Sequence, residues 1–286
     1  MNTQIKFGPA GNAQSFADAG FKATADAPRW LHDMGLNAYE YQCGRGVNIG
    51  ETTARKIAAQ AAQYGIAMSL HAPYYINLSN RDEERVQKNI GYVLASCQAA
   101  TWLGADRIVV HTGGVGKQSR TKAFENTKEN VRDILNAVEQ AEYTTTICLE
   151  TMGKQSVIGS AEEIFELVAL DDRLLPCIDF GHLNARTCGK CSTEAEFAQV
   201  LDLMENTIGI ARARVFHSHF SHIEYGPKGE VRHLTFADEQ YGPDFAPLAK
   251  LIAQRGWTPR FICESAGTQA EDAKQMMDMY LASQNA

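Results

Sequence analysis

In the stretch Ile147-Cys148-Leu149-Glu150, a short apolar run ends at a polar side chain of a type that binds metals, and this pattern predicts the fold. Short apolar runs of this kind are typical of buried parallel strands. The pattern recurs along the chain at wide, nearly even intervals. The residues at the ends of these runs are His71, His111, Glu150, Asp179, His219 and Glu264.

Helix-like segments separate the apolar runs. We expect strands at 5–7, 37–41, 66–71, 107–111, 145–150, 175–179, 213–219 and 260–264. We expect helices at 27–34, 52–64, 82–103, 122–142, 161–170, 193–206, 244–255 and 269–282. Eight such units without a Pro/Ser-rich linker predict an α/β fold, a single (β/α)₈ TIM-barrel domain over residues 1–286. The one long irregular stretch that we expect, 220–242, follows the seventh strand, where barrel loops usually carry function.

The ends of parallel strands in a barrel converge on its C-terminal face. Carboxylates crowded together raise one another's pKa, and a divalent cation relieves that repulsion. Histidine nitrogens and carboxylate oxygens are ligands that zinc-like metals prefer. We therefore expect a metal site at the C-terminal face of the strands.

Strand alternation adds a condition, because residues two positions before inward-facing ligands must also point inward. Those residues are mostly small or apolar, as the interior of a barrel requires. The exception is His217, which either supports a ligand or is a hydrogen-bonded core histidine. The six positions are Ser69, Val109, Cys148, Cys177, His217 and Ile262.

Two more histidines extend the candidate site. Asp179-Phe-Gly-His182 places an imidazole about one turn past a strand end, and His233 lies in the long seventh loop. His32, in an expected surface helix, and His222, in the loop, are expected to face solvent, although His222 could swing inward. Five of the eight histidines thus belong to one expected cluster.

Composition limits the partners and the compartment. The 286 residues are 44% hydrophobic and carry a net charge of −7, which argues against broad nonspecific affinity for nucleic acid but allows a local basic groove. No apolar stretch approaches the length that spans a bilayer, and Met1-Asn2-Thr3-Gln4 lacks the start of a secretion signal. We expect a cytoplasmic protein without a membrane partner, and nothing in the sequence implies a protein partner.

Seven cysteines fit a reducing compartment better than a disulfide framework. Cys188-Gly-Lys-Cys191 is the one Cys-x-x-Cys pair in the sequence. It either binds metal or cycles redox, or it is an ordinary loop turn, since no second pair follows to complete a zinc knuckle.

Several blocks in order resemble the endonuclease IV family of apurinic/apyrimidinic endonucleases, within the xylose isomerase-like TIM-barrel superfamily. The resemblance begins at His71-Ala-Pro-Tyr74 and ends at Cys263-Glu264-Ser265. The intermediate blocks are Val110-His111-Thr-Gly113, Leu149-Glu150-Thr151, Cys177-Ile-Asp179-Phe-Gly-His182, His219-Phe-Ser221 and Arg232-His233.

The resemblance implies a trinuclear zinc site, with manganese as the alternative metal, that hydrolyses DNA 5′ to an abasic site in base excision repair. It implies that His71 and His111 hold one zinc and that Glu150 bridges to a second, which Asp179, His219 and Glu264 complete. His182 and His233 would belong to the third zinc. Glu264 would also orient the attacking water and, with Glu150, form the catalytic pair.

DNA is the partner that this resemblance implies. Tyr74 matches an aromatic residue that approaches the DNA in the family. Gln42-Cys-Gly-Arg45 lies on the second strand–helix loop, where the family inserts side chains into the duplex. Gln42 and Arg45 are therefore candidate substrate contacts, although Arg45 is equally well an ordinary surface arginine.

Three departures from the family pattern concern the third zinc and its surroundings. Val231 stands where the family has a ligating aspartate, so only the first two zincs keep their full ligand sets. Glu230 could replace that carboxylate if the loop turns differently, but in an extended chain Glu230 faces away from His233. Phe220-Ser221-His222 replaces an Asn-Asp pair after the strand histidine, and Gly181 replaces a cysteine.

The leading hypothesis is therefore a metal-dependent phosphodiesterase, and its main rival is a single-metal sugar or polyol isomerase or epimerase of the same superfamily. The rival needs only four ligands, which Glu150, Asp179, His219 and Glu264 supply. His71 and His111 favour hydrolysis, because a single-metal site has no use for them. A metal-binding barrel without catalysis is a third, weaker hypothesis.

Overall fold

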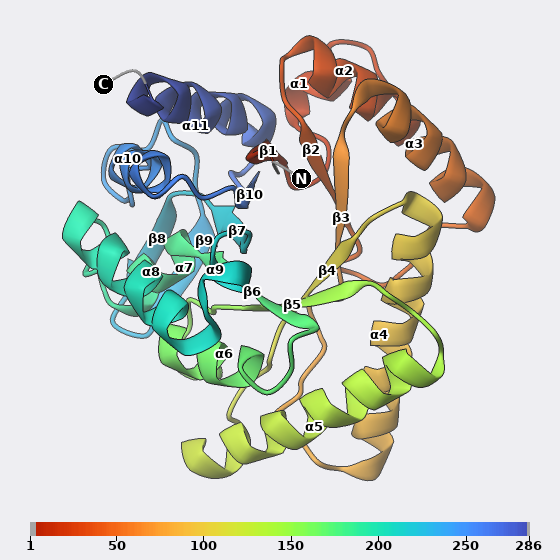
Figure 1. Ribbon diagram of the computed structural model, residues 1–286, viewed down its shortest axis with the longest axis vertical. Helices are drawn as coiled ribbons and strands as arrows, with labels where there is room; N and C mark the ends of the chain where they lie inside the picture. Colours follow the sequence, from red (N-terminus) through yellow and green to blue (C-terminus); the bar gives the residue numbers. More distant parts are fainter. Residues whose placement is uncertain (1–3, 285–286) are drawn as a thin grey trace.

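The computed structural model describes residues 4–284 and confirms the (β/α)₈ barrel (Figure 1). Eight parallel strands form one sheet in the order β1-β10-β7-β6-β5-β4-β3-β2. The expected strand positions are correct to within a few residues at each end. The strands are β1 (Lys6–Pro9), β2 (Ala38–Gln42), β3 (Ala67–His71), β4 (Arg107–Val110), β5 (Thr146–Glu150), β6 (Leu174–Asp179), β7 (His217–Phe220) and β10 (Arg260–Cys263).

The first and second strands meet where the sheet nearly closes on itself. A parallel bridge joins Ala10 to Glu40, and the Gly11 N–H donates to the Glu40 carbonyl over 2.9 Å. Gly8 permits the close approach, since a Cβ at this position would lie 1.8 Å from the Ala38 carbonyl oxygen. The missing side chain of Gly8 therefore helps to bring β1 against β2.

The helices surround the sheet in chain order (Figure 1). Glycines in the left-handed conformation end two of them, Gly65 at φ 69° and Gly104 at φ 66°. Ser160 and Thr193 each begin a helix with a reciprocal capping box. The helices that match the expected ones are α2 (Ala27–Asp33), α3 (Glu51–Tyr64), α4 (Glu83–Leu103), α5 (Arg120–Gln140), α6 (Ala161–Val168), α8 (Glu194–Ile208), α10 (Ala246–Arg255) and α11 (Gln269–Gln284).

Several short elements were not expected from the sequence. The stretch 220–242 is not irregular throughout, because β8 (Ile223–Gly226) and β9 (Gly229–His233) form an antiparallel hairpin in it. The seventh expected strand, 213–219, begins too early, since Ala213 ends a short helix. The additional helices are α1 (Gln14–Asp18), the 3₁₀ helix η1 (Thr24–Asp26), α7 (Phe180–Arg186) and α9 (Ile210–Ala213).

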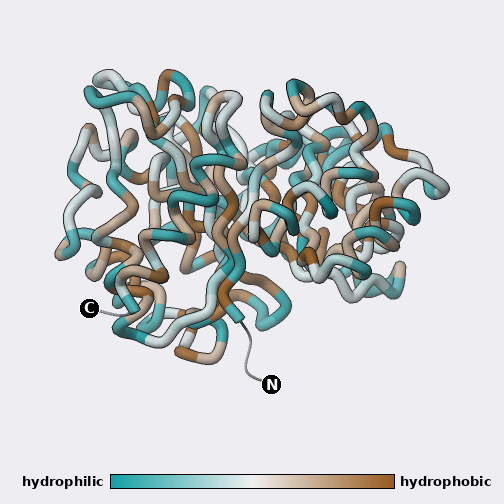
Figure 2. Tube along the Cα trace, turned by 90° about the horizontal axis from the view of Figure 1, so that it is seen from above, coloured by the Kyte–Doolittle hydropathy of each residue, from teal (hydrophilic) through white to brown (hydrophobic). Residues whose placement is uncertain are grey.

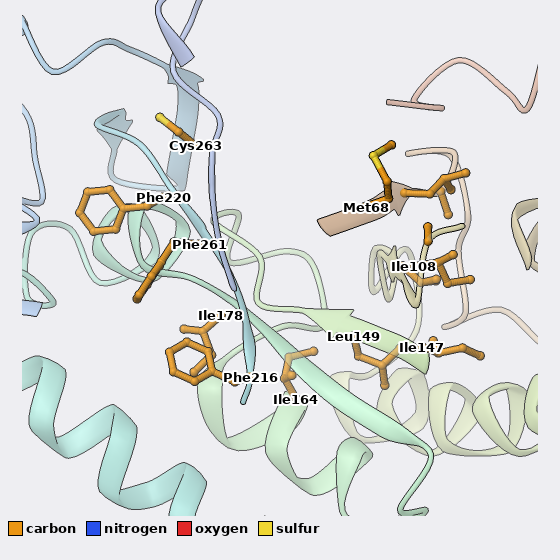
Figure 3. Close-up of a cluster of buried hydrophobic side chains, with 14 of the residues drawn as sticks. Met68, Ile108, Ile147, Leu149, Ile164, Ile178, Phe216, Phe220, Phe261 and Cys263 are labelled. Atoms are coloured by element: carbon orange, nitrogen blue, oxygen red, sulfur yellow. The ribbon is translucent and has the colours of Figure 1, made fainter. Parts of the chain in front are cut away.

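The apolar core has two parts. The larger part lies between the strands and the helices and contains Ile164, Ile178 and Phe216, which Figure 3 draws near one another. The smaller part is a separate buried cluster of Val109, Cys148, Leu175 and Cys177. Val109, Cys148 and Cys177 are three of the small or apolar residues expected to face the barrel interior. Hydrophilic segments lie mainly along the outer helices and loops (Figure 2).

Met1–Thr3 and Asn285–Ala286 lie outside the described residues, so the expectation drawn from the first four residues falls almost entirely outside them. Among residues 4–284, none of the helices combines the length and the apolar character that crossing a membrane requires.

Candidate metal centre

The strand ends bring the six residues of the repeating pattern to one mouth of the barrel. His71, Glu150 and Asp179 are the last residues of their strands, and His219 lies within β7. His111 and Glu264 directly follow β4 and β10. Potential ligand atoms lie within 4.8 Å of one another in several groups. Those at the mouth are His71/His111/Glu150, His71/His219/Glu264, His182/Glu230/His233 and Glu150/Asp179/His219/Glu264.

Four of these imidazoles hold one ring nitrogen on a protein oxygen and turn the other toward the carboxylates. His71 Nδ1 lies 2.7 Å from the Ala72 carbonyl oxygen, and His182 Nδ1 lies 2.9 Å from that of Thr151. Their Nε2 atoms lie 3.5 Å from oxygens of Glu150 and Glu230, respectively. A backbone carbonyl can only accept a hydrogen bond, so Nδ1 carries a hydrogen and Nε2 is the nitrogen that a metal can take.

His219 and His233 are also held at one ring nitrogen by a protein oxygen. In His219 that nitrogen is Nε2 rather than Nδ1, and in His233 the oxygen belongs to a hydroxyl group. His219 Nε2 lies 2.9 Å from Glu40 Oε1, and its Nδ1 lies 3.0 Å from Glu150 Oε1. His233 Nδ1 lies 2.8 Å from the hydroxyl of Ser221, and its Nε2 lies 4.0 Å from Glu264 Oε2. This arrangement is the one in which histidine ligands of metals are held.

Glu150 and Asp179 are completely buried, and each has an oxygen without a hydrogen-bond donor among the described residues. His111 Nε2 lies 2.9 Å from Glu150 Oε2 but is not aligned to donate to it. Burial raises the pKa of Glu150, but the charges of His219 and His111 outweigh it and hold that pKa well below its usual range. Burial and the charge of Glu264 raise the pKa of Asp179. Buried acceptors that lack donors are where a cation is expected.

The carboxylates have the opposite effect on the histidines. Burial lowers the pKa of His71, but contact with Glu150 and the charges of Glu40 and Glu264 outweigh this and raise the pKa to about 9. Burial is likewise outweighed at His182 and His219, and neighbouring anionic groups raise both pKa values well above the ordinary value. In the absence of a metal, these raised pKa values favour the protonated form of the three rings.

Of the two alternatives for Glu230, the one in which the loop turns it toward His233 is correct, because β9 contains a bulge. Tyr225 pairs with Glu230 and Glu224 pairs with Arg232, so Val231 has no partner across the hairpin. The extra residue reverses the alternation between Glu230 and His233. Val231 is 55% exposed, while Glu230 Oε2 lies 3.5 Å from His182 Nε2. Glu230 thereby joins His182 and His233 in one group.

The other two departures from the family pattern also have structural explanations. Ser221 places its hydroxyl on His233 and so helps to orient that ring. At Gly181 a Cβ would lie 2.5 Å from the Ser221 carbonyl oxygen and 3.0 Å from Ile223. A cysteine side chain would not fit at Gly181 without moving the start of the hairpin.

Loops after three strands join above one side of the mouth. Lys154 pairs with Gly229 and Gly114 pairs with Val157, each in an antiparallel bridge. The Glu230 N–H donates to the Gly153 carbonyl over 3.2 Å. Gly229 has φ 95°, and a Cβ there would lie 2.1 Å from that same carbonyl oxygen. The hairpin therefore docks closely on the loop after β5 and holds Glu230 over the mouth.

A pocket of about 530 Å³ opens above the cluster. Gln42 and Tyr74 line it, as do Tyr75, Asn77 and Lys154, which the sequence analysis missed. Tyr74 is 60% exposed at the rim. Arg45 is exposed on the loop after β2 and does not line this pocket.

Glu40 is a further residue of the site that the sequence pattern did not indicate. It is completely buried in β2, beneath the mouth, with His217 Nε2 2.9 Å from Oε2 and His219 Nε2 2.9 Å from Oε1. Burial raises its pKa, but the two histidines outweigh this and hold the pKa well below its usual range. One feature of the sequence could have indicated Glu40: it is a lone carboxylate inside an expected strand, two residues before the candidate Gln42.

The remaining residues of interest lie away from the mouth. His217 is completely buried, and Glu40 lies between it and His219. His217 is therefore both a hydrogen-bonded core histidine and an indirect support of a candidate ligand. Cys188 is exposed, Cys191 is buried, and both are free thiols. His222 is half-buried, with Nδ1 3.0 Å from the Asp238 carbonyl oxygen, and stacks on Phe236 rather than turning inward. His32 is exposed.

The fold and the site define a (β/α)₈ barrel with a cluster of histidines and carboxylates at the carboxyl ends of its strands. The chain belongs to the xylose isomerase-like TIM barrel family, whose model matches residues 28–282. An uncharacterized protein of Methanocaldococcus jannaschii is 32% identical over 98% of this chain and 99% of its own length.

More distant similarities include a curated relative and a solved structure. A probable endonuclease 4 of Mycoplasma genitalium is 27% identical over 64% of this chain and 61% of its own length. The crystal structure of a D-tagatose 3-epimerase-like protein superposes with a TM-score of 0.74 at 19% identity, covering 98% of each chain. At that identity, the structural similarity shows the fold alone.

Proposed function

We propose that the protein is a metal-dependent phosphodiesterase that cleaves DNA 5′ to abasic sites. The observation that carries this proposal is the number of donor groups at the mouth. Beyond the set Glu150/Asp179/His219/Glu264, two further groups form around His71 and His111 and around His182, Glu230 and His233. A cluster of metals requires donors of this number, whereas a single metal leaves most of them without a role. The similarity to endonuclease 4 proteins agrees with this proposal.

The residues fit divalent zinc or manganese. Glu150 and Asp179 each offer a buried oxygen without a donor in the described part of the chain, and the Nε2 atoms of His71 and His111 lie 3.5 and 2.9 Å from that oxygen of Glu150. His71, His111 and Glu150 would hold one ion; Asp179, His219 and Glu264 would complete a second, which Glu150 bridges. His182, Glu230 and His233 would hold a third. Such ions, when bound, lower the pKa of water and offset the charge of a phosphate.

Residues of the chain would orient the water molecule, accept its proton and contact the substrate. Glu264 is partly exposed to the pocket, with Oε2 3.5 Å from His219 Nδ1, so it can orient a water molecule and accept its proton. Glu150 is buried and would act through the ions it joins. Tyr74 and Gln42 line the pocket and would contact the substrate, and Arg45 would contact a phosphate or base from outside the pocket.

A single-metal sugar epimerase is the second candidate function. It is favoured by the compact group Glu150/Asp179/His219/Glu264 and by a pocket of about 530 Å³, which is large enough to hold a small molecule. On this reading the extra histidines and Glu230 would bind no metal, so the two candidates predict different numbers of ions per chain.

Two measurements on the same preparation test the proposal. Zinc- or manganese-loaded protein is incubated with a duplex that carries one abasic site and with an undamaged duplex of the same sequence, and bound metal is counted by elemental analysis. We expect cleavage of the first duplex and two or three ions per chain. One ion per chain without cleavage would overturn the phosphodiesterase, and epimerisation of ketohexoses by that protein would support the second candidate.

A further inference from the structure

Glu40 is a buried carboxylate that neither the family resemblance nor the proposed ligand sets use. We propose that Glu40 is a positioning residue that holds His219 in the tautomer whose Nδ1 lone pair faces the metal. This inference rests on the proposed metal centre. It assigns to Glu40 a role in metal affinity, without direct contact with metal or substrate.

The contacts of Glu40 determine which atoms donate. His219 Nε2 lies 2.9 Å from Oε1, and His217 Nε2 lies 2.9 Å from Oε2. Ser69 donates its hydroxyl to Oε2 over 2.9 Å, and Gln42 donates its amide to Oε1 over 3.2 Å. An ionised carboxylate can only accept hydrogen bonds, so each of the four neighbours must present a hydrogen to it. The whole arrangement is buried away from water, apart from Gln42.

When a metal lies between His219 and the carboxylates of Glu150 and Glu264, the tautomer of His219 with its hydrogen on Nδ1 is unfavourable. A hydrogen on Nδ1 alone would leave the Nε2 lone pair against a carboxylate oxygen 2.9 Å away, with water excluded. With the hydrogen on Nε2, the free lone pair is on Nδ1, which lies 3.0 Å from Glu150 Oε1 and 3.5 Å from Glu264 Oε2. Glu150 and Glu264 are proposed ligands, so the free nitrogen of His219 points to the position where they would meet a metal.

His217 completes the arrangement. Its Nε2 must present a hydrogen to Glu40, because an ionised carboxylate can only accept one. The buried Nδ1 has no hydrogen-bond partner within the residues that the structure describes. An acceptor nitrogen without a partner is less costly than an unpaired donor in the same place. His217 therefore keeps Glu40 in place and does not compete for the metal.

The affinity test compares two substitutions at the same carboxylate. Glu40→Gln keeps the shape but removes the charge, and Ser69→Ala removes one neutral donor while leaving the contact with His219 intact. Each variant is titrated with Co²⁺ and followed by its visible absorption, without any substrate. We expect Glu40→Gln to bind one ion about 10–100-fold more weakly, the usual loss for a carboxylate behind a histidine ligand, and Ser69→Ala to change affinity far less.

A second measurement uses the wild-type protein, so it does not depend on whether a variant folds. The ¹⁵N resonances of the His219 ring are recorded by NMR in the zinc-loaded wild-type protein. We expect a hydrogen on Nε2 and a metal-shifted Nδ1; a hydrogen on Nδ1 would overturn the role of Glu40. Equal Co²⁺ affinity of Glu40→Gln and wild type would overturn it as well, while the metal centre would stand. Failure of the wild type to bind metal would overturn the metal centre and with it this role.

Discussion

Glu230 and His233 lie three positions apart in β9 and yet face the same side of the hairpin, because Val231 bulges out of the pairing. In a regular strand, residues at this spacing point to opposite faces. The bulge thus supplies a carboxylate beside His182 and His233 although the expected aspartate position holds valine. This relationship leads to the first prediction.

Deletion of Val231 should remove the third ion while leaving the barrel folded. Without the extra residue, regular pairing would turn Glu230 to the opposite face from His233. We expect elemental analysis to find one ion fewer per chain than in the wild type. Val231→Ala keeps the bulge and should keep the ion, because the exposed valine side chain has no role in binding. Equal metal content in the deletion variant and in Val231→Ala would contradict this prediction.

Glu264→Gln should abolish turnover while largely sparing the fold. The amide cannot accept a proton from water, and loss of a general base typically lowers the rate by about 10²–10⁴-fold. The measurement is cleavage of the abasic duplex under single-turnover conditions, with thermal unfolding as the check on folding. Arg45→Ala is the matched control, because Arg45 lies outside the pocket lining and should lower substrate affinity rather than the rate of cleavage. Activity near that of the wild type would remove Glu264 from the assigned role.

The metal-free protein should lose stability as the pH rises from about 6.5 to about 9. The folded-state pKa of His71 is raised to about 9 from its ordinary 6.5, and those of His182 and His219 are raised as well. A raised pKa contributes stability that is fully present below the unfolded pKa and is lost as the pH passes through the folded one. Thermal unfolding of metal-free protein over this range is the measurement.

Metal binding should release protons in the same pH range. The ligand histidines must be neutral to bind, so the protons that they hold in the metal-free protein are displaced. Calorimetric titration with Zn²⁺ in two buffers of different ionisation enthalpy measures the number released. For the thermal unfolding measurements described above, metal-loaded protein is the control, and its stability should not decline above pH 6.5. Binding heats that do not depend on the buffer would rule out this exchange.

Asp106→Asn should lower the free energy of unfolding by about 1–2 kcal/mol at neutral pH, because it breaks the ion pair with Arg260. This loss lies between those typical of exposed and of buried ion pairs. The carboxylate, on an exposed residue, accepts from the buried Arg260 over 2.8 and 3.1 Å. Burial raises the pKa of Asp106, but the charges of Arg260 and Arg107 outweigh it and lower the pKa. The stabilisation is therefore present above the unfolded pKa and is lost as the pH falls through the folded one. Urea unfolding at pH 7 and pH 3 checks this, since the difference from wild type should be smaller at the lower pH.

Patterns in the amino-acid sequence are enough to predict the barrel and most of the residues of the cluster. Apolar runs that end at Glu150 or Asp179 predict strands, and parallel strands in a barrel must bring their carboxyl ends together. Local alternation also predicts that Val109, Cys148 and Cys177 face inward, and they form the interior cluster of the barrel. These features depend on neighbouring residues in the chain, so a local pattern is enough to predict them.

The positions of Glu230 and Glu40 depend on contacts that the sequence pattern does not contain. The bulge at Val231 depends on which residues pair across the hairpin and on the docking of Gly229 against Gly153, and no spacing within β9 indicates it. Glu40 meets His219 across the barrel, 179 positions away in the chain. Contacts between distant strands depend on the register of the sheet and on the meeting of β1 with β2, because the side chains that face one another inside a barrel come from all its strands.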